Sequence, residues 1–145
     1  MKSCADTSFL ASLYVQDVFN HRAQAWLARH PASLPLTGFG RAELRNALAR
    51  LVFTGALTSQ DGAAAWQMVE ADLRFGRLQT RSLLWDDVFV QAEHLAVGHT
   101  AQIGTRTLDV LHVASALVSG CREFVSFDAR QATLAQAAGL VWCSP

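Results

Sequence analysis

Four acidic residues of this chain stand where carboxylates could bind a metal ion. Asp6 and Asp128 each close a short apolar run, Asp109 opens an apolar helical segment, and Glu43 lies in a helical segment between them. Two carboxylates about 4 Å apart repel each other by roughly 4 kcal/mol at an effective dielectric constant near 20. A cluster of acids therefore needs a positive charge, and hard divalent cations such as Mg²⁺ bind carboxylate oxygens. If the four acids converge, we expect a metal site.

Each of these acids also has a purely structural explanation. Asp128 is followed at the third position by Gln131, and a D-x-x-Q sequence can form a helix capping box. Asp109 falls in the first turn of its helix, where the helix dipole favours an acid. Asp6 could simply end a strand, and Glu43 could be an exposed helical residue. Taken singly, none of the four acids identifies a metal site.

The hydrophobic pattern alternates between short strands and helices. It predicts strands at 2–5, 34–37, 77–81, 123–127 and 140–143. It predicts helices at 8–14, 17–29, 40–54, 59–75, 85–97, 107–118 and 129–138. Asp17 is expected to cap the second helix, and Gly98 is expected to break the helix that begins at Trp85.

This order of elements predicts an α/β fold with a parallel sheet. We expect a three-layer α/β/α sandwich in which helices cover both faces of a central parallel sheet of four to five short strands. The length of 145 residues fits a single domain spanning 1–145. Ligands of open parallel sheets bind at the carboxyl ends of strands. Asp6 and Asp128 are both predicted to lie there.

Composition restricts the partners only weakly. The formal net charge is zero, so no global basic field indicates a nucleic acid. Eleven of the twelve cationic residues are Arg, and Lys2 is the one Lys. Arginine suits bidentate contact with phosphate, although a GC-rich coding sequence would produce the same bias.

The three cysteines and the N-terminus point to the cytoplasm. Cys4, Cys121 and Cys143 are far apart and form no C-x-x-C pair, which excludes the common zinc and redox motifs. Each adjoins an apolar run, where a reduced cysteine packs as a small hydrophobe. The N-terminus lacks the shape of a signal peptide, and no apolar stretch reaches the roughly 18 residues of a membrane helix. We expect a cytoplasmic protein with reduced cysteines and no membrane partner.

Four blocks of sequence resemble one known family. They are Cys-Ala-Asp-Thr-Ser-Phe-Leu (4–10), Gly-Arg-Ala-Glu-Leu-Arg-Asn-Ala-Leu (40–48), Arg-Thr-Leu-Asp-Val-Leu-His-Val-Ala-Ser-Ala (106–116) and Phe-Val-Ser-Phe-Asp-Ala-Arg-Gln (124–131). In order and spacing they resemble PIN-domain ribonucleases, and among these the toxin component of VapBC-type toxin–antitoxin pairs. The resemblance runs along essentially the whole chain.

The resemblance implies a metal-dependent endoribonuclease that hydrolyses RNA phosphodiester bonds. Its catalytic set would be four acids and two serines: Asp6, Ser8, Glu43, Asp109, Ser126 and Asp128. The four acids would hold Mg²⁺, with Mn²⁺ as a substitute, and the two serine hydroxyls would orient water or an acid. One or two such ions can activate a water molecule and stabilise the charge on the scissile phosphate.

The resemblance also implies partners. RNA would be the substrate, with Arg41, Arg45, Arg106 and Arg130 as candidate phosphate contacts. A cognate antitoxin would lie along helices near 8–27 and 43–54. Surplus apolar residues of the two central helices predict a two-fold homodimer: Phe53, Leu57, Trp66, Met68, Val69 and Phe75.

Two other classes of function compete with the ribonuclease. A non-catalytic PIN-like module would bind protein or RNA through the same scaffold, and loss of an acid would favour it, but all four acids are present. A phosphotransfer or phosphatase domain would use Asp6 as nucleophile. That chemistry usually requires a D-x-D pair and a downstream lysine, whereas Ser8 occupies the second acid position and Lys2 is the single lysine. The phosphatase hypothesis ranks last.

Overall fold

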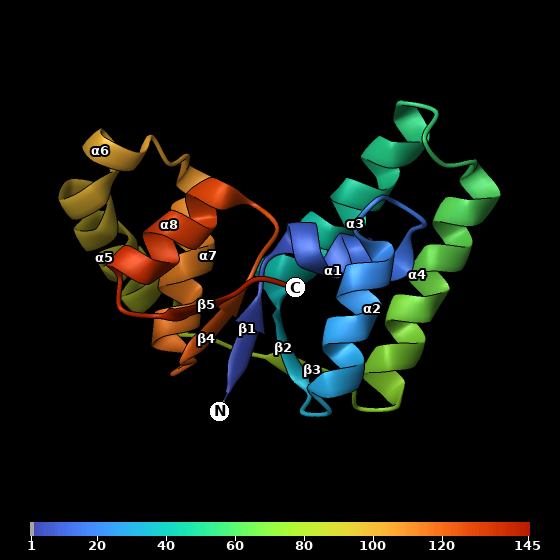
Figure 1. Ribbon diagram of the computed structural model, residues 1–145, viewed down its shortest axis with the longest axis horizontal. Helices are drawn as coiled ribbons and strands as arrows, with labels where there is room; N and C mark the ends of the chain where they lie inside the picture. Colours follow the sequence, from blue (N-terminus) through green and yellow to red (C-terminus); the bar gives the residue numbers. More distant parts are fainter. Residues whose placement is uncertain (1) are drawn as a thin grey trace. The chain divides into compact units, whose positions relative to one another are not determined.

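The five strands that the computed structural model describes form two parallel sheets (Figure 1). β1 (Ser3–Ala5), β4 (Glu123–Val125) and β5 (Val141–Cys143) make a three-stranded sheet in the order β1-β4-β5. β2 (Leu34–Thr37) and β3 (Leu78–Arg81) pair with each other. The mixed α/β class and the parallel direction are confirmed. The sequence predicts one central sheet of four to five strands, whereas the strands form a three-stranded and a two-stranded sheet.

The structure describes residues 2–145, which fold as two compact units. The first unit contains the described residues up to Asp6 together with Ser82–Ser144, and so holds the three-stranded sheet. The second contains Thr7–Arg81 with Pro145, and holds the two-stranded sheet. The boundary falls directly after Asp6, so the acids predicted for one site are divided between the units.

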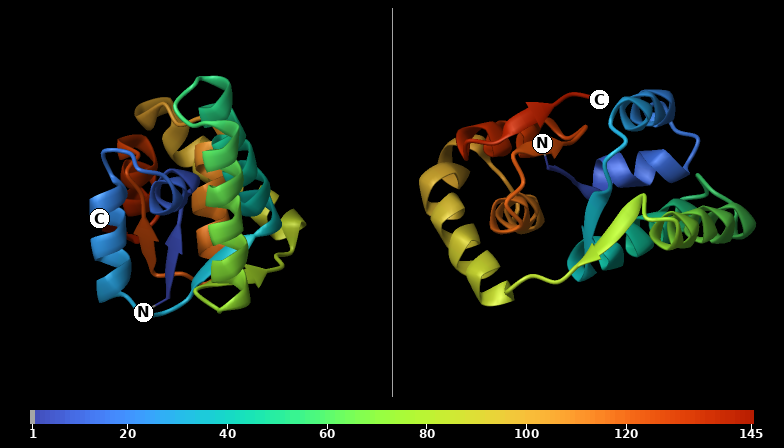
Figure 2. Two further views of the ribbon diagram at one scale, coloured as in Figure 1. Left: turned by 90° about the vertical axis from the view of Figure 1, so that its right-hand side faces the viewer. Right: turned by 90° about the horizontal axis from the view of Figure 1, so that it is seen from below.

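The first unit contains five helical segments besides its sheet. They are α5 (Trp85–Leu95), the π-helical segment η1 (Ala96–Thr100), α6 (Ala101–Ile103), α7 (Thr107–Val118) and α8 (Ala129–Ala137). α7 is seen end-on in the right-hand view of Figure 2 and packs against both α5 and α8. The core of this unit is apolar: Cys4, Val88, Leu95, Val110, Val113, Ala114, Ala116, Cys121, Phe124, Leu134, Ala135 and Leu140. The helix α7, which carries Asp109, is thus fixed on its apolar side.

The prediction that Gly98 breaks the fifth helix is wrong. The helical path continues beyond Leu95 as a π-helical turn, and ends at Gly104, whose φ is +75°. A glycine inside a helix costs only about 1 kcal/mol relative to alanine, which packing can offset. A left-handed residue, in contrast, ends the helix geometrically. The hydroxyls of Thr100 and Thr105 bond across this turn at 2.9 Å.

The second unit is built on four helices. They are α1 (Thr7–Tyr14), α2 (Asn20–Arg29), α3 (Gly38–Phe53) and α4 (Ser59–Arg74). Figure 1 shows α3 and α4 as an antiparallel pair. Each of these two helices begins at a threonine cap, as N-cap preferences require: Thr37 Oγ1 accepts from Gly40 N, and Thr58 Oγ1 accepts from Asp61 N, both over 3.0 Å.

Asp17 joins two helices instead of capping the second one. α2 begins at Asn20, two residues later than a cap at Asp17 would place it. The Asp17 carboxylate accepts a hydrogen bond from Ser12 Oγ of α1 over 2.8 Å and one from the Phe19 N–H over 2.9 Å. The predicted cap is therefore replaced by a tether across the α1–α2 turn.

Of the apolar residues predicted to form a dimer interface on and beside α3 and α4, some are exposed and others are buried. Phe53 and Phe75 expose 87% and 81% of their surface, and Met68 is also exposed. Val69 is completely buried in the core, so its assignment to an interface is wrong. Leu57 and Trp66 are half-buried. Any interface on these helices would rest mainly on Phe53, Met68 and Phe75.

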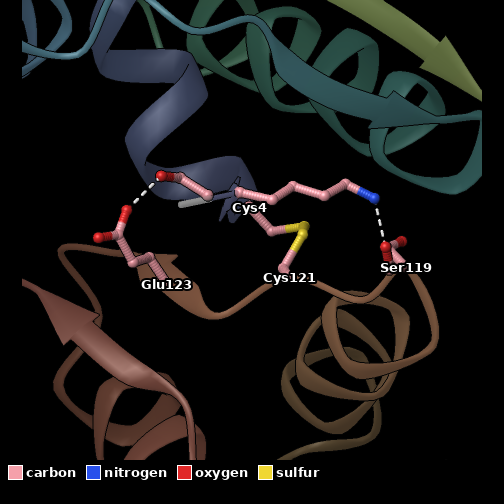
Figure 3. The surroundings of a disulfide bond; sticks show 6 residues. Cys4, Ser119, Cys121 and Glu123 are labelled. Atoms are coloured by element: carbon pink, nitrogen blue, oxygen red, sulfur yellow. Dashed lines mark hydrogen bonds between the residues drawn. A yellow bond between two sulfur atoms is a disulfide. The ribbon is translucent and has the colours of Figure 1, made fainter.

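A disulfide joins Cys4 in β1 to Cys121, which precedes β4 (Figure 3). The expectation of reduced cysteines is therefore wrong for this pair, while Cys143 is free. Parallel pairing of β1 and β4 brings the two cysteines, 117 residues apart in sequence, to a Cα–Cα distance of 5.9 Å. Ser3 also donates to the Glu123 carboxylate across the same strands. The bond fixes β1, whose end carries Asp6, to the segment that leads into β4.

Within residues 2–145, no helix is both long enough and apolar enough to span a bilayer.

Candidate active site

Asp6 and Ser126 are side by side at the carboxyl ends of β1 and β4. The Asp6 N–H donates to the Val125 carbonyl over 3.1 Å and so extends the strand pairing by one residue. Ser126 Oγ donates to Asp6 Oδ2 over 2.7 Å. Both residues are 0% exposed. Since a buried carboxylate needs hydrogen-bond donors, Ser126 is part of what holds Asp6 in place.

Asp128 is the N-cap of α8, as predicted. Its Oδ1 accepts from Arg130 N over 2.8 Å and from Gln131 N over 3.1 Å. Its own N–H donates to Ser126 Oγ over 2.9 Å, so one serine hydroxyl contacts both acids. The capping box is only half formed, because the Gln131 side chain turns to another partner. Both cap bonds use Oδ1, which leaves Oδ2 available to a ligand.

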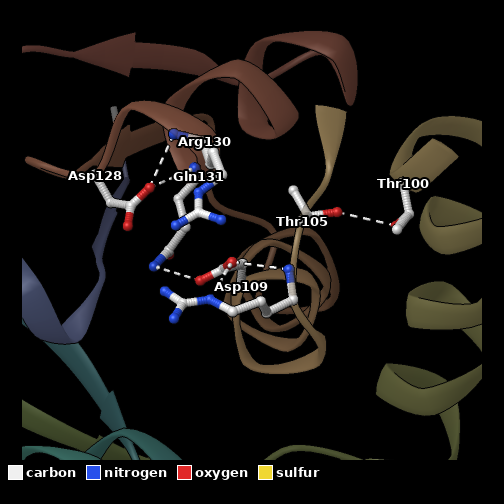
Figure 4. A network of polar contacts seen from close by, with 7 residues as sticks. Thr100, Thr105, Asp109, Asp128, Arg130 and Gln131 are labelled. Carbon is white, nitrogen blue, oxygen red and sulfur yellow. Dashed lines mark hydrogen bonds and ion pairs between the residues drawn. The ribbon is translucent and has the colours of Figure 1, made fainter. Parts of the chain in front are cut away.

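Asp109 occupies the first turn of α7 and is 4% exposed. Its Oδ2 accepts from the Arg106 N–H over 2.9 Å and lies 3.5 Å from the Arg106 guanidinium. Its Oδ1 accepts from Gln131 Nε2 over 3.3 Å. Figure 4 shows these contacts together with the Asp128 cap. The carboxylate is thus held from its own helix and from α8.

These contacts form one continuous polar chain within the first unit. It runs from Asp6 through Ser126 to Asp128, and on through Gln131 to Asp109. Three carboxylates from distant parts of the sequence are thereby connected at one end of the three-stranded sheet. Neutral donors separate them, which reduces their mutual repulsion.

The donor set of this chain fits a hard divalent cation in kind. Carboxylate oxygens are the ligands that Mg²⁺ and Mn²⁺ prefer. The site also contains an orphaned buried acceptor, because Gln131 Oε1 has no hydrogen-bond partner in the described part of the chain. Across residues 2–145, however, no three Asp, Glu, His or Cys side chains converge into a ready-made metal-binding group. The carboxylates are held by hydrogen bonds and, at Asp109, also by the Arg106 guanidinium, whereas the sequence predicts that they gather around one point.

Glu43 and Ser8 belong to the second unit. Glu43 Oε2 accepts from Thr7 Oγ1 over 2.6 Å, which joins α3 to the first residue of α1. Ser8 is the next residue of α1, and its carbonyl accepts from Ser12 Oγ over 3.1 Å. Sequence reasoning missed Thr7, although its place directly after Asp6 in the Asp-Thr-Ser block was a usable signal. The catalytic roles of Glu43 and Ser8 stay predictions.

The four candidate arginines fall into two groups. Arg106 and Arg130 are exposed in the first unit, next to Asp109 and Asp128 along the chain of contacts. Arg41 and Arg45 belong to the second unit, where their guanidinium groups lie 4.8 Å and 4.4 Å from the centre of the Trp66 ring. Arg41 also forms an ion pair with Glu70. Arg106 and Arg130 thus combine exposure with a position beside acids of the polar chain.

The second unit has a cavity of about 510 Å³ with an apolar and acidic lining. Tyr14, Leu51, Leu57 and Met68 line it, together with Asp17 and Asp61. The Tyr14 hydroxyl donates to Asp72 Oδ2 over 2.8 Å. Burial, and then the bond to Asp72, raise the pKa of Tyr14 well above its ordinary value. On the helices near 8–27, where an antitoxin is expected to bind, four apolar residues belong to the core: Leu10, Leu13, Tyr14 and Trp26.

Comparison with known proteins gives one family. The model of the PIN domain family matches residues 3–137. A search among curated proteins finds no match. Several solved structures are similar over nearly the whole chain.

VapC20 from Mycobacterium tuberculosis, a sarcin–ricin loop cleaving toxin, has a TM-score of 0.72 and 22% identity over 99% of this chain and 100% of that one. VapBC2 from Rickettsia felis, bound to a DNA fragment from their promoter, has a TM-score of 0.67 and 14% identity over 99% of this chain and 98% of that one. FitAcB from Neisseria gonorrhoeae has a TM-score of 0.63 and 17% identity over 98% of this chain and 96% of that one. At these identities the similarity defines the fold.

Proposed function

Because the chain belongs to the PIN domain family, we propose that it is a metal-dependent endoribonuclease and the toxin of a toxin–antitoxin pair. One observation carries this proposal. Asp6, Asp109 and Asp128 are connected by an unbroken chain of hydrogen bonds at the carboxyl end of a parallel sheet. Ligand sites of open α/β sheets occur at that end. The similarity to a solved RNA-cleaving toxin supports the same substrate class.

In this proposal the three acids hold the cation and Ser126 positions two of them. A bound Mg²⁺ or Mn²⁺ would neutralise charge on the scissile phosphate and activate water for its hydrolysis. Ser126 keeps the Asp6 carboxylate in one orientation, because its hydroxyl is bonded to Oδ2. Asp128 uses Oδ1 for the helix cap and keeps Oδ2 for the ligand. Glu43, in the other unit, is the fourth acid predicted from the sequence.

RNA would be held by cations beside the acids. Arg106 and Arg130 are exposed, and each adjoins one acid through a hydrogen bond of its backbone N–H. Guanidinium groups bind phosphate oxygens in a bidentate manner. We therefore propose that these two arginines bind backbone phosphates of single-stranded or looped RNA. We propose no RNA contact for Arg41 and Arg45, whose guanidinium groups lie over the Trp66 ring.

An antitoxin is the natural partner of such an enzyme, and the cavity between α1, α3 and α4 suits one. Apolar side chains line that cavity, and Asp17 and Asp61 supply negative charge. An amphipathic segment carrying Lys or Arg would complement both features. VapBC2 is a similar structure solved with promoter DNA, which supports placing this chain in a VapBC-type pair.

A two-fold homodimer is the second assembly that we propose. Phe53 and Phe75 are almost fully exposed, and Met68 is about half exposed. Large contiguous apolar patches mark interfaces, and isologous contacts are the commonest form. A single monomeric species in light scattering at tens of micromolar would contradict the dimer.

The alternative is a non-catalytic PIN-like module that binds protein or RNA. It is favoured by one observation, namely that no three metal-ligating side chains converge in residues 2–145. Such a module would bind RNA or the antitoxin without cutting RNA, and it would not depend on a divalent cation.

The two functions are separated by an RNA cleavage assay with controlled metal. Purified protein is incubated with end-labelled RNA in Mg²⁺, in Mn²⁺ and in EDTA. The ribonuclease proposal predicts cleavage in both metals and none in EDTA. Binding of RNA without cleavage in any condition would contradict it and favour the binding module. Expression of the chain alone should arrest growth, whereas the Asp6→Ala variant should not.

A further inference from the structure

Gln131 is a buried amide placed between two acids of the polar chain. It lies in the first turn of α8 and is 7% exposed. Its backbone N–H donates to Asp128 Oδ1 over 3.1 Å, and its side-chain Nε2 donates to Asp109 Oδ1 over 3.3 Å. One residue therefore bonds to two carboxylates that are 19 positions apart in sequence. Figure 4 shows the side chain directed from α8 toward Asp109.

The other end of the same side chain is a buried acceptor. Among residues 2–145, no group donates a hydrogen bond to Gln131 Oε1. A buried acceptor without a donor is unfavourable, and native proteins rarely retain one unless a water molecule or an ion supplies the missing contact. An apolar residue of similar volume would avoid this cost, and it would lose only the bond to Asp109. The presence of an amide at this position is explained if both its NH₂ group and its carbonyl oxygen have a role.

We propose that Gln131 is a positioning residue of the acid site. Its side-chain N–H group holds the Asp109 carboxylate, and its carbonyl oxygen would accept a hydrogen bond from water around a divalent cation held by the acids. This inference rests on the proposed function, since it requires that the acids bind such a cation. The amide contributes two features that an acid could not combine: it donates to Asp109, and it adds no negative charge to three carboxylates.

A purely structural Gln131 would behave differently. In that case a trapped water molecule would satisfy Oε1, and the side chain would only tie α8 to α7. Replacement by an apolar residue would then change the stability of the protein and leave its affinity for metal unchanged. Partners that orient metal ligands typically change metal affinity by about 10-fold to 100-fold when they are removed. Metal affinity is therefore the property that separates the two roles.

The test compares Gln131→Met with Gln136→Met in the full chain. Both residues are on α8, and Gln136 is exposed. Methionine preserves the length and flexibility of the side chain and removes both polar groups. Gln131→Asn, which keeps the amide on a chain shorter by one methylene, is the second variant. Mn²⁺ affinity is measured by electron paramagnetic resonance, and the melting temperature without metal is measured by circular dichroism.

We expect both Gln131 variants to raise the Kd for Mn²⁺ by about 10-fold or more, with Gln136→Met equal to the wild type. The melting temperature of Gln131→Met without metal should change by no more than about 4 °C, because loss of the Asp109 bond and removal of the unpartnered Oε1 oppose each other. An unchanged Kd in both Gln131 variants, with Mn²⁺ binding by the wild type, would overturn this inference alone. Absence of Mn²⁺ binding in the wild type would overturn the proposed metal-dependent function and this inference with it.

Discussion

Ser126 donates a hydrogen bond from Oγ to Asp6 Oδ2 over 2.7 Å, and both side chains are completely buried. The same hydroxyl oxygen accepts from the Asp128 N–H over 2.9 Å. A single small side chain thus fixes the carboxylate at the end of β1 and the start of α8. The geometry of the acid site depends on this serine, although it carries no charge.

Replacement of Ser126 by alanine should destabilise the protein without metal by about 2 kcal/mol. A hydrogen bond to a charged group contributes roughly that amount, and its loss leaves a buried carboxylate less well satisfied. Chemical denaturation measures the free energy of unfolding. Ser115 provides a matched control, because it is buried in the same unit and no described residue forms a hydrogen bond with its Oγ. Ser115→Ala should be neutral or slightly stabilising. Equal losses in the two variants would show that the Ser126 bond is not the cause.

The acids are predictable from the sequence because strand ends and helix starts follow from hydrophobic periodicity. Asp6 follows β1, Asp128 caps α8 and Asp109 lies in the first turn of α7, as expected. The partners of these acids are not predictable in the same way. The sequence pattern predicts Gln131 as half of a local capping box, whereas its side chain bonds to Asp109 on another helix. A contact between residues far apart in sequence depends on packing, which periodicity does not reveal.

Other differences have the same physical origin. The Cys4–Cys121 bond depends on the parallel register of β1 and β4, and no local spacing of cysteines indicates it. A glycine such as Gly98 often marks the end of a helix, but this helical segment ends at Gly104, which has a left-handed backbone conformation. Val69 belongs by its spacing to the apolar stripe of its helix. The spacing does not show which residues of that stripe face the core and which face solvent, and Val69 is buried.

Tyr14 should stay protonated in the folded protein well above pH 10. Burial and the bond to Asp72 raise its pKa in the folded state, while the unfolded chain keeps a pKa near 10. This difference in pKa contributes to the free energy of unfolding, and the contribution is fully present below pH 10. It is lost as the pH rises from there toward the folded-state pKa, by up to about 1.4 kcal/mol per pH unit. Since the chain has one tyrosine, tyrosinate absorbance reports it alone. Tyr14→Phe should flatten the alkaline loss of stability. A folded-state titration midpoint near pH 10 would contradict the prediction.

Reduction of the Cys4–Cys121 bond should lower the free energy of unfolding by about 4–5 kcal/mol. The two cysteines are 117 residues apart, and cross-links that close long loops restrict the unfolded chain most. Denaturation with and without a reducing agent measures the effect. Cys4→Ala/Cys121→Ala should match the reduced wild type, and Cys143→Ala should respond to the reductant as the wild type does. Insensitivity of the wild type to the reductant would mean that this bond does not form in solution.

Replacement of Arg106 or Arg130 by alanine should weaken RNA binding about equally for different RNA sequences. Each arginine that binds a phosphate releases counterions, so its replacement should also reduce the slope of log K against log salt by about 0.7 for a single strand. Fluorescence anisotropy at several salt concentrations gives both quantities. Arg122→Ala is the control. Arg122 is exposed and directly precedes β4, whereas the acids lie beyond the other end of this strand. An equally large effect of Arg122→Ala would indicate non-specific attraction only.

Asp128→Asn tests the central claim most directly, because asparagine caps a helix about as well as aspartate does while it removes the carboxylate charge. The rate of RNA cleavage in Mg²⁺ is measured under single-turnover conditions, alongside the melting temperature. If the acids hold a catalytic cation, the rate should fall by at least about 100-fold, which corresponds to roughly 3 kcal/mol of lost transition-state stabilisation. The melting temperature should stay close to that of the wild type. Cleavage by Asp128→Asn at the wild-type rate would contradict the metal-dependent ribonuclease assigned to this site.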